Sequence, residues 1–84
     1  MKTIRIRYFA SIRETLGTGS ETVQTSAETV GALRDDLIAR GGAYADALAR
    51  GKAVRTAVNQ VMSSEQSALQ DGVELAFFPP VTGG

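Results

Sequence analysis

The segment Thr29–Arg40 constrains the fold most, because it is the clearest helical pattern in the chain. Its apolar residues recur at helical spacing on one face: Val30, Leu33, Leu37 and Ile38. Thr29 is a suitable N-cap, and Gly41-Gly42 is expected to end the helix. The solvent side is expected to carry Arg34, Asp35 and Asp36. A helix with one apolar stripe needs a second layer to cover it, so the remaining segments must supply that layer.

Short strands are predicted on both sides of this helix. Thr3–Phe9 alternates strictly, with Ile4, Ile6 and Tyr8 on one face, which is typical of a half-buried strand. The other predicted strands are Glu21–Thr25, Val54–Val58, Val61–Met62 and Glu74–Phe78. The turn signals are Asn59-Gln60 and Asp71-Gly72. Ala10–Leu16 is ambiguous but compatible with a helical turn, and Ala43–Arg50 is compatible with a further short helix. The pattern predicts an α+β domain in which a small mixed sheet packs on one main helix.

The composition excludes several classes of function. The 84 residues include 9 Lys plus Arg and 9 Asp plus Glu, so the broad positive charge of a nucleic-acid-binding protein is missing. There is no Cys and no His, which removes disulfides, thiolate nucleophiles, the usual zinc ligands and the commonest general base. The segment MKTIRIRYF lacks the apolar core of a signal peptide, and no stretch is long enough to span a membrane. We therefore expect a cytoplasmic protein with no nucleic-acid or membrane partner that is not an enzyme on its own.

The C-terminal segment Pro79–Gly84 holds the candidate functional site. Pro79-Pro80 ends the last strand, and the six residues could extend about 20 Å beyond the fold. Gly83-Gly84 has no side chains, so it could enter a channel only as wide as a backbone and present a free carboxylate. A frayed terminus is the competing interpretation, because chain ends are commonly disordered. We expect residues 1–78 to form the domain and residues 79–84 a flexible, protruding tail.

Several motifs resemble one family. Three of them are similar to motifs of the small, sulfur-carrying subunits of molybdopterin synthase: AFFPPVTGG at the end of the chain, AVNQ at residues 57–60 and the Asp71-Gly72 turn. The YFA segment and the stretch Ile12–Gly17 are similar to that family as well, and the resemblance covers essentially the whole chain. It implies a ubiquitin-like β-grasp fold, in which the first and last strands are parallel neighbours.

The resemblance also implies a function. A ubiquitin-activating-like adenylyltransferase would use ATP to adenylate Gly84, and a sulfur donor would convert the adenylate to a thiocarboxylate. A channel of the large synthase subunit would hold the tail residues Pro79, Pro80, Val81, Thr82 and Gly83. There the sulfur would pass to cyclic pyranopterin monophosphate during molybdenum cofactor biosynthesis, in a complex of two small and two large subunits. This chain itself would bind no cofactor.

A docking surface is predicted beside the tail. Phe77 and Phe78 are adjacent in a strand and must face opposite sides, so Phe77 is assigned to the core and Phe78 to the outer face. Phe9 is expected at the same end of the sheet, with Met62 near it, as an apolar partner-binding cluster. Both rings packing under a loop is the alternative. Arg5 and Arg7 could meet an acidic partner surface, or could simply be the solvated face of a strand.

Other functions remain open. A sulfur carrier for thiamine or for tRNA thiolation would share the fold and the tail, and so would a protein modifier joined through Gly84 to target lysines. A plain interaction module is a further alternative. Asp35-Asp36 is not expected to form a metal site, because adjacent carboxylates on a helix do not face one another.

Overall fold

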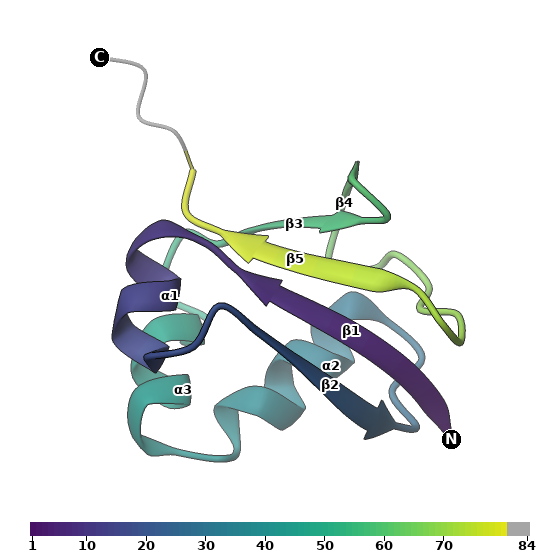
Figure 1. The fold of residues 1–84 in the computed structure, drawn as a ribbon, viewed down its shortest axis with the longest axis horizontal. Helices are drawn as coiled ribbons and strands as arrows, with labels where there is room; N and C mark the ends of the chain where they lie inside the picture. The colour runs from purple at the N-terminus through teal and green to yellow at the C-terminus, as the bar shows by residue number, and fades with distance from the viewer. Residues whose placement is uncertain (81–84) are drawn as a thin grey trace.

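A computed structural model describes residues 1–80, which form a sheet with helices on one side of it (Figure 1). The strands are β1 (Lys2–Tyr8), β2 (Ser20–Thr25), β3 (Arg55–Val58), β4 (Val61–Ser63) and β5 (Glu74–Phe78). The helices are α1 (Ala10–Leu16), α2 (Val30–Ile38) and α3 (Gly42–Leu48). The predicted α+β architecture is confirmed, and α2 is the longest helix of the described chain.

The first and last strands of the described chain, β1 and β5, lie side by side in the interior of the sheet. The strand order is β2-β1-β5-β3-β4, and β1 pairs with β5 in parallel while the other neighbours are antiparallel. The register places Tyr8 opposite Phe77 and Arg55 opposite Phe78. The parallel pairing expected from the β-grasp resemblance is confirmed. As a consequence, the chain leaves β5 between β1 and β3, at the same end of the sheet where α1 begins (Figure 1).

The core lies between the sheet and the helices. The inward residues of β1 meet the apolar stripe of α2, and all of them are buried: Ile4, Ile6, Tyr8, Val30, Leu33 and Leu37. Phe77 is fully buried, as predicted, and its ring stacks on that of Tyr8 with centroids 6.1 Å apart. Burial of one such large side chain contributes about 1.5–3 kcal/mol, so this pair fixes the parallel register of β1 and β5. Ile38, at the end of the predicted stripe, is only half-buried.

Helix α2 begins as predicted and ends two residues before the predicted end at Arg40. The Thr29 Oγ1 accepts a hydrogen bond from the Ala32 backbone N–H at 3.1 Å, which confirms the N-cap. At the other end, the N–H groups of Arg40 and Gly41 donate to carbonyls three residues earlier, so the last turn tightens. Gly41 then adopts a φ of +76°, which reverses the chain into α3.

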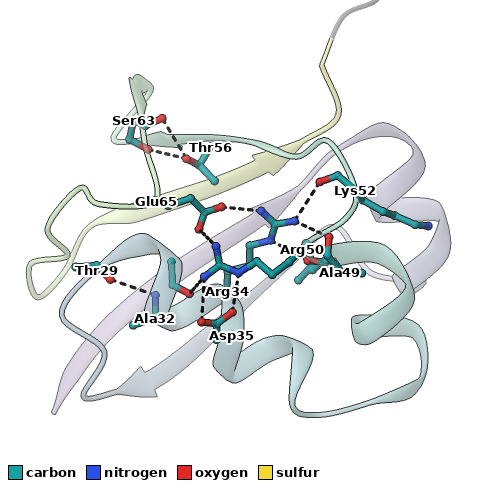
Figure 2. Close-up of polar contacts among 12 residues, drawn as sticks. Thr29, Ala32, Arg34, Asp35, Ala49, Arg50, Lys52, Thr56, Ser63 and Glu65 are labelled. Atoms are coloured by element: carbon teal, nitrogen blue, oxygen red, sulfur yellow. Dashed lines mark hydrogen bonds and ion pairs between the residues drawn. The ribbon is translucent and has the colours of Figure 1, made fainter.

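Arg34 was predicted on the solvent side of α2, and this prediction is wrong, because only 4% of the residue is exposed. Its Nη1 donates to Glu65 Oε1 at 2.6 Å, its Nε donates to the Leu48 carbonyl at 2.8 Å, and its Nη2 donates to the Ala49 carbonyl at 2.7 Å. Figure 2 shows this cluster between α2 and the turn that follows α3. The helical period of α2 alone could not reveal that another segment covers this side.

The ambiguous segments form regular structure. Residues 10–16 form α1, and the helix compatible with residues 43–50 is present as α3. Asn59 and Gln60 both have positive φ, at +49° and +69°, as the two central residues of a tight hairpin turn require. The Asp71-Gly72 turn is fastened to the start of β1, because Asp71 Oδ1 accepts a hydrogen bond from the Thr3 backbone N–H at 2.7 Å.

Candidate functional site

The carboxyl end of β5 is where the C-terminal segment leaves the sheet. Pro79 and Pro80 follow Phe78, lie outside any strand or helix and are half-buried. The Phe9 backbone N–H donates to the Phe77 carbonyl at 3.1 Å, which continues the parallel pairing and holds the start of α1 beside this exit. The remaining residues of the predicted tail, Val81, Thr82, Gly83 and Gly84, lie outside the described residues.

Met62 and Phe78 lie on the outer face, which we define as the side of the sheet that no helix covers (Figure 1). Phe9 follows β1 as the N-cap residue of α1 and lies beside Arg7 of that face. The register aligns Met62 with Ala57, Ala57 with Ala76, and Ala76 with Arg7, so these four residues form one row across the sheet. Met62 is 61% exposed and Phe9 is 40% exposed, so no loop of the described chain covers them. Phe78, which alternates with the buried Phe77, is half-buried.

The two predicted arginines add positive charge to the outer face. Both Arg5 and Arg7 are exposed, and neither forms an ion pair within residues 1–80. The Arg7 guanidinium lies 5.4 Å from the centre of the Phe9 ring, a cation–π contact that holds both side chains in place. A shallow hollow of about 250 Å³ lies beside the two arginines and is also lined by Thr22 and Glu74. The face therefore offers apolar contacts next to unpaired guanidinium groups.

A second polar cluster, centred on Glu21 of β2, was not predicted. Glu21 Oε2 accepts hydrogen bonds from the hydroxyls of Tyr8 at 2.9 Å and Tyr44 at 2.6 Å, and Oε1 accepts one from Arg40 at 2.8 Å. Burial alone would raise the pKa of Glu21, but the hydrogen bonds from Tyr44, Arg40 and Tyr8 outweigh it and lower that pKa. Burial, reinforced by Glu21, raises the pKa of Tyr8. The cluster fastens the edge strand β2 to the helical layer.

One of the two adjacent carboxylates of α2, that of Asp35, forms an ion pair. Arg50 donates to both carboxylate oxygens of Asp35, at 2.8 and 3.0 Å, and these hydrogen bonds lower the pKa of Asp35. Within the residues that the structure describes, no group of three or more acidic, His or Cys side chains is placed to hold a metal ion. None of the described helices has the length and apolar character needed to cross a membrane.

Lys52 is a candidate residue that the sequence did not associate with the tail. Lys52 and Pro79 line the same cleft, together with residues of α1 and α3. The two residues are far apart in the sequence, and no motif or period connects them. The antiparallel pairing of β3 with β5, which sets Arg55 opposite Phe78, and the packing of α3 against α1 together bring the turn after α3 to the exit of β5.

Comparison with known proteins gives consistent matches over nearly the whole chain. Residues 6–84 match the ThiS family. The molybdopterin synthase sulfur carrier subunit of Escherichia coli K12 is 46% identical over 81 residues, which cover 96% of this chain and 99% of that protein. The protein with the same name in Haemophilus influenzae is 38% identical, also over 96% of this chain and 99% of its own length.

Solved structures agree with this family assignment. A crystal structure of small archaeal modifier protein 1 (SAMP1) from Haloferax volcanii superposes with a TM-score of 0.75 at 28% identity, over 98% of this chain and 99% of that chain. The ubiquitin-like β-grasp fold expected from the motifs is thereby confirmed. The chain therefore belongs to the ThiS family and is a relative of the molybdopterin synthase sulfur carrier subunits.

Proposed function

We propose that this chain is the sulfur-carrying small subunit of a molybdopterin synthase and that Gly84 carries the sulfur. The observation that carries the proposal is the match of nearly the entire chain, at 46% identity, to a protein named as such a carrier. The family match extends through Gly84, the residue that the proposal requires. The absence of Cys and His from the sequence fits a carrier whose reactive group is a backbone carboxylate.

The first stage of the proposed cycle activates Gly84. A carboxylate is a poor electrophile because its leaving group would be an oxide. In the active site of an adenylyltransferase, a carboxylate oxygen of Gly84 attacks the α-phosphorus of ATP, and pyrophosphate leaves. A donor equivalent to hydrosulfide then attacks the acyl carbon of the adenylate, and AMP leaves with the bonding electrons. The product is a C-terminal thiocarboxylate, and no net oxidation or reduction occurs in these two steps.

The second stage transfers the sulfur. In the large synthase subunit, the thiocarboxylate sulfur attacks an electrophilic carbon of the cyclic pyranopterin precursor, and an oxygen substituent of that carbon leaves with the bonding electrons and takes up a proton. Water then cleaves the bond between the acyl carbon and sulfur, which restores the Gly84 carboxylate and leaves the sulfur on the precursor. Two sulfurs are needed per product, so the carrier must dissociate and be charged again. The acids and bases for these steps come from the partners.

The arrangement of the described residues supports this role of the tail. The parallel pairing of β1 and β5 directs Pro79 away from the sheet at the same end as Phe9 and Phe78. A large subunit that covers the outer face would bury the exposed side chains of Phe9 and Met62, in keeping with the apolar centre of protein interfaces. Arg7, which forms no ion pair within residues 1–80, would lie within the same interface. Docking and delivery of the tail would therefore be coupled in one binding event.

A Gly84 deletion tests the proposal. We expect the truncated chain to bind the large subunit and to keep its melting temperature, yet to transfer no sulfur to the precursor. Gly83→Val should also lower transfer strongly, because a β-branched side chain would not fit a channel shaped for backbone. Full product formation by the chain without Gly84 would contradict the proposal.

The likeness to SAMP1 favours a second candidate function, that of a protein modifier attached through Gly84 to lysines of other proteins. Both functions require the same adenylate, and they differ in the group that attacks it. Isopeptide adducts on proteins isolated from cells would support the modifier, whereas the free thiocarboxylate would support the carrier. A carrier for thiamine or tRNA thiolation would form the same thiocarboxylate and is distinguished by its acceptor.

A further inference from the structure

A cleft lies beside the exit of β5, separate from the outer face. Its volume is about 110 Å³, and it is lined by Ser11, Ile12, Thr15, Ala47, Lys52, Ala53, Val54 and Pro79. One water molecule needs about 10–15 Å³ of cavity volume, so the cleft can accept a short side chain. Its lining combines buried apolar groups of Ile12 and Ala47 with two exposed residues that carry hydroxyls, Ser11 and Thr15. Lys52 contributes the only charged side chain among the described residues that line it.

Hydrogen bonds of its backbone fix the position of Lys52. The Lys52 N–H donates to the Ala49 carbonyl at 2.9 Å, and the Lys52 carbonyl accepts a hydrogen bond from Arg34 Nη2 at 3.3 Å. Arg34 is itself held by its ion pair with Glu65. Figure 2 shows the Lys52 side chain directed away from this cluster. Hydrogen bonds therefore hold the backbone of this turn, whereas the Lys52 ammonium group takes no part in them.

The charge of Lys52 has no partner in the described chain. No ion pair of Lys52 is present within residues 1–80, although Arg34, Arg40 and Arg50 all form ion pairs there. A cation held at the edge of a cleft with hydroxyls inside it is complementary to a carboxylate on a short side chain. Burial of that carboxylate against Ile12 and Ala47 would reduce its screening by water, which strengthens the attraction.

The location of the cleft determines which protein would supply the carboxylate. Pro79 forms one wall of the cleft, and it is the first residue after β5. A protein that encloses the residues after Pro80 in a channel must bring the mouth of that channel to Pro79. The same approach places the rim of the channel beside Lys52.

We propose that Lys52 and this cleft form a second contact site that receives an acidic side chain from the rim of the tail channel in the large synthase subunit. The inference rests on the proposed function, because it assumes that a partner encloses the tail. The outer face and the cleft then contact the partner on two sides of Pro79. Because of these two contacts, the tail enters the channel in one orientation.

The test measures binding of the full-length chain to its large subunit. Lys52→Glu should weaken binding about tenfold, as expected when a charge pair at an interface is reversed. Lys52→Arg should bind within about twofold of the original chain, because it keeps the charge. Arg13→Glu is the matched control: Arg13 is exposed on α1, lines a different hollow and undergoes the same change of net charge. We expect this control to change binding less than about twofold.

Salt dependence gives a second readout. The effect of Lys52→Glu should shrink between about 0.1 M and about 1 M salt, because the screening length falls from about 10 Å to about 3 Å. Equal affinities of the Lys52→Glu variant and the original chain would overturn the inference, and so would an equal loss for Arg13→Glu. Lys52→Met, which removes the charge without reversing it, should give an intermediate loss.

The failure of this inference is distinguishable from failure of the proposed function. If Lys52→Glu binds normally while deletion of Gly84 abolishes sulfur transfer, the carrier function stands and the second contact site is wrong. If deletion of Gly84 leaves transfer intact, the proposed function itself is wrong. Thermal unfolding of each Lys52 variant should match the original chain, because the exposed side chain takes no part in the Arg34 cluster.

Discussion

Arg34 Nη1 lies 2.6 Å from Glu65 Oε1, and this ion pair joins α2 to the segment that follows β4. The same guanidinium donates to carbonyls at the end of α3, so one buried side chain connects three separate parts of the chain (Figure 2). Arg34 is a positioning residue in this arrangement. Its contacts place the turn that carries Lys52 beside the exit of β5.

Replacing Arg34 should therefore destabilise the fold. Arg34→Met leaves buried carbonyls without donors and removes one partner of a largely buried ion pair, so we expect a loss of about 3 kcal/mol in the free energy of unfolding. Arg50→Met, at a side chain that is 49% exposed, should lower it by less than about 1 kcal/mol. Urea unfolding of both variants checks this, and equal losses would show that burial of Arg34 is not the deciding factor.

Gly31 should not tolerate a side chain, although it lies in a helix where Ala is normally favoured by about 1 kcal/mol. A Cβ atom at Gly31 would lie 2.9 Å from Glu65 Oε2 and 3.1 Å from the Glu65 carbonyl oxygen. Gly31→Ala should therefore lower the melting temperature. Gly51→Ala is the matched control, because a Cβ there has no neighbour within 4 Å, and it should leave the melting temperature nearly unchanged. A stabilised Gly31→Ala chain would contradict the close approach of Glu65.

Protonation of Glu21 should lower the free energy of unfolding at acid pH. Because hydrogen bonds from Tyr44, Arg40 and Tyr8 outweigh burial and lower its pKa in the folded state, the ionised form contributes stability above the unfolded-state pKa of about 4.3. That contribution is lost as the pH falls through the lower folded-state pKa. The difference in unfolding free energy between the original chain and Glu21→Gln should thus be larger at about pH 7 than at about pH 3.

Urea titrations at the two pH values measure this difference. Tyr44→Phe removes the hydroxyl that donates to Glu21 at 2.6 Å, so it should reproduce part of the effect. A difference between the original chain and Glu21→Gln that stays constant with pH would show that the cluster does not favour the charged carboxylate.

Substitution of Phe77 should mainly lower the stability of the fold, whereas substitution of Phe78 should mainly weaken binding to the large subunit. Phe77→Ala empties a fully buried site and should cost about 3–5 kcal/mol of unfolding free energy. Phe78→Ala, on the half-buried outer face, should weaken binding to the large subunit about tenfold or more while lowering the melting temperature much less. Calorimetric measurements of binding and thermal unfolding of both variants test this prediction. If Phe78→Ala unfolds the chain as readily as Phe77→Ala, the outer face is not a docking surface.

The parallel pairing of β1 with β5 was expected from the family resemblance alone, whereas the other features that the sequence predicted correctly depend on neighbours along the chain. Strand alternation is sufficient to place Phe77 inward and Phe78 outward, and Thr29 caps its own helix. Arg34 was misplaced because its partner Glu65 lies 31 residues away, in a segment without a regular period. The position of Lys52 in the Pro79 cleft likewise depends on the pairing of β3 with β5 and on the packing of α3 against α1, which no single segment shows by its own pattern.

The central claim is that the backbone carboxylate of Gly84 carries the sulfur. Its most direct test is mass spectrometry of the intact chain, and of its C-terminal peptide, after incubation with the activating adenylyltransferase, ATP and a sulfide source. The account predicts a mass increase equal to the exchange of one oxygen for one sulfur, located at Gly84 and absent when ATP is omitted. An unchanged mass, or sulfur found at any other residue, would contradict it.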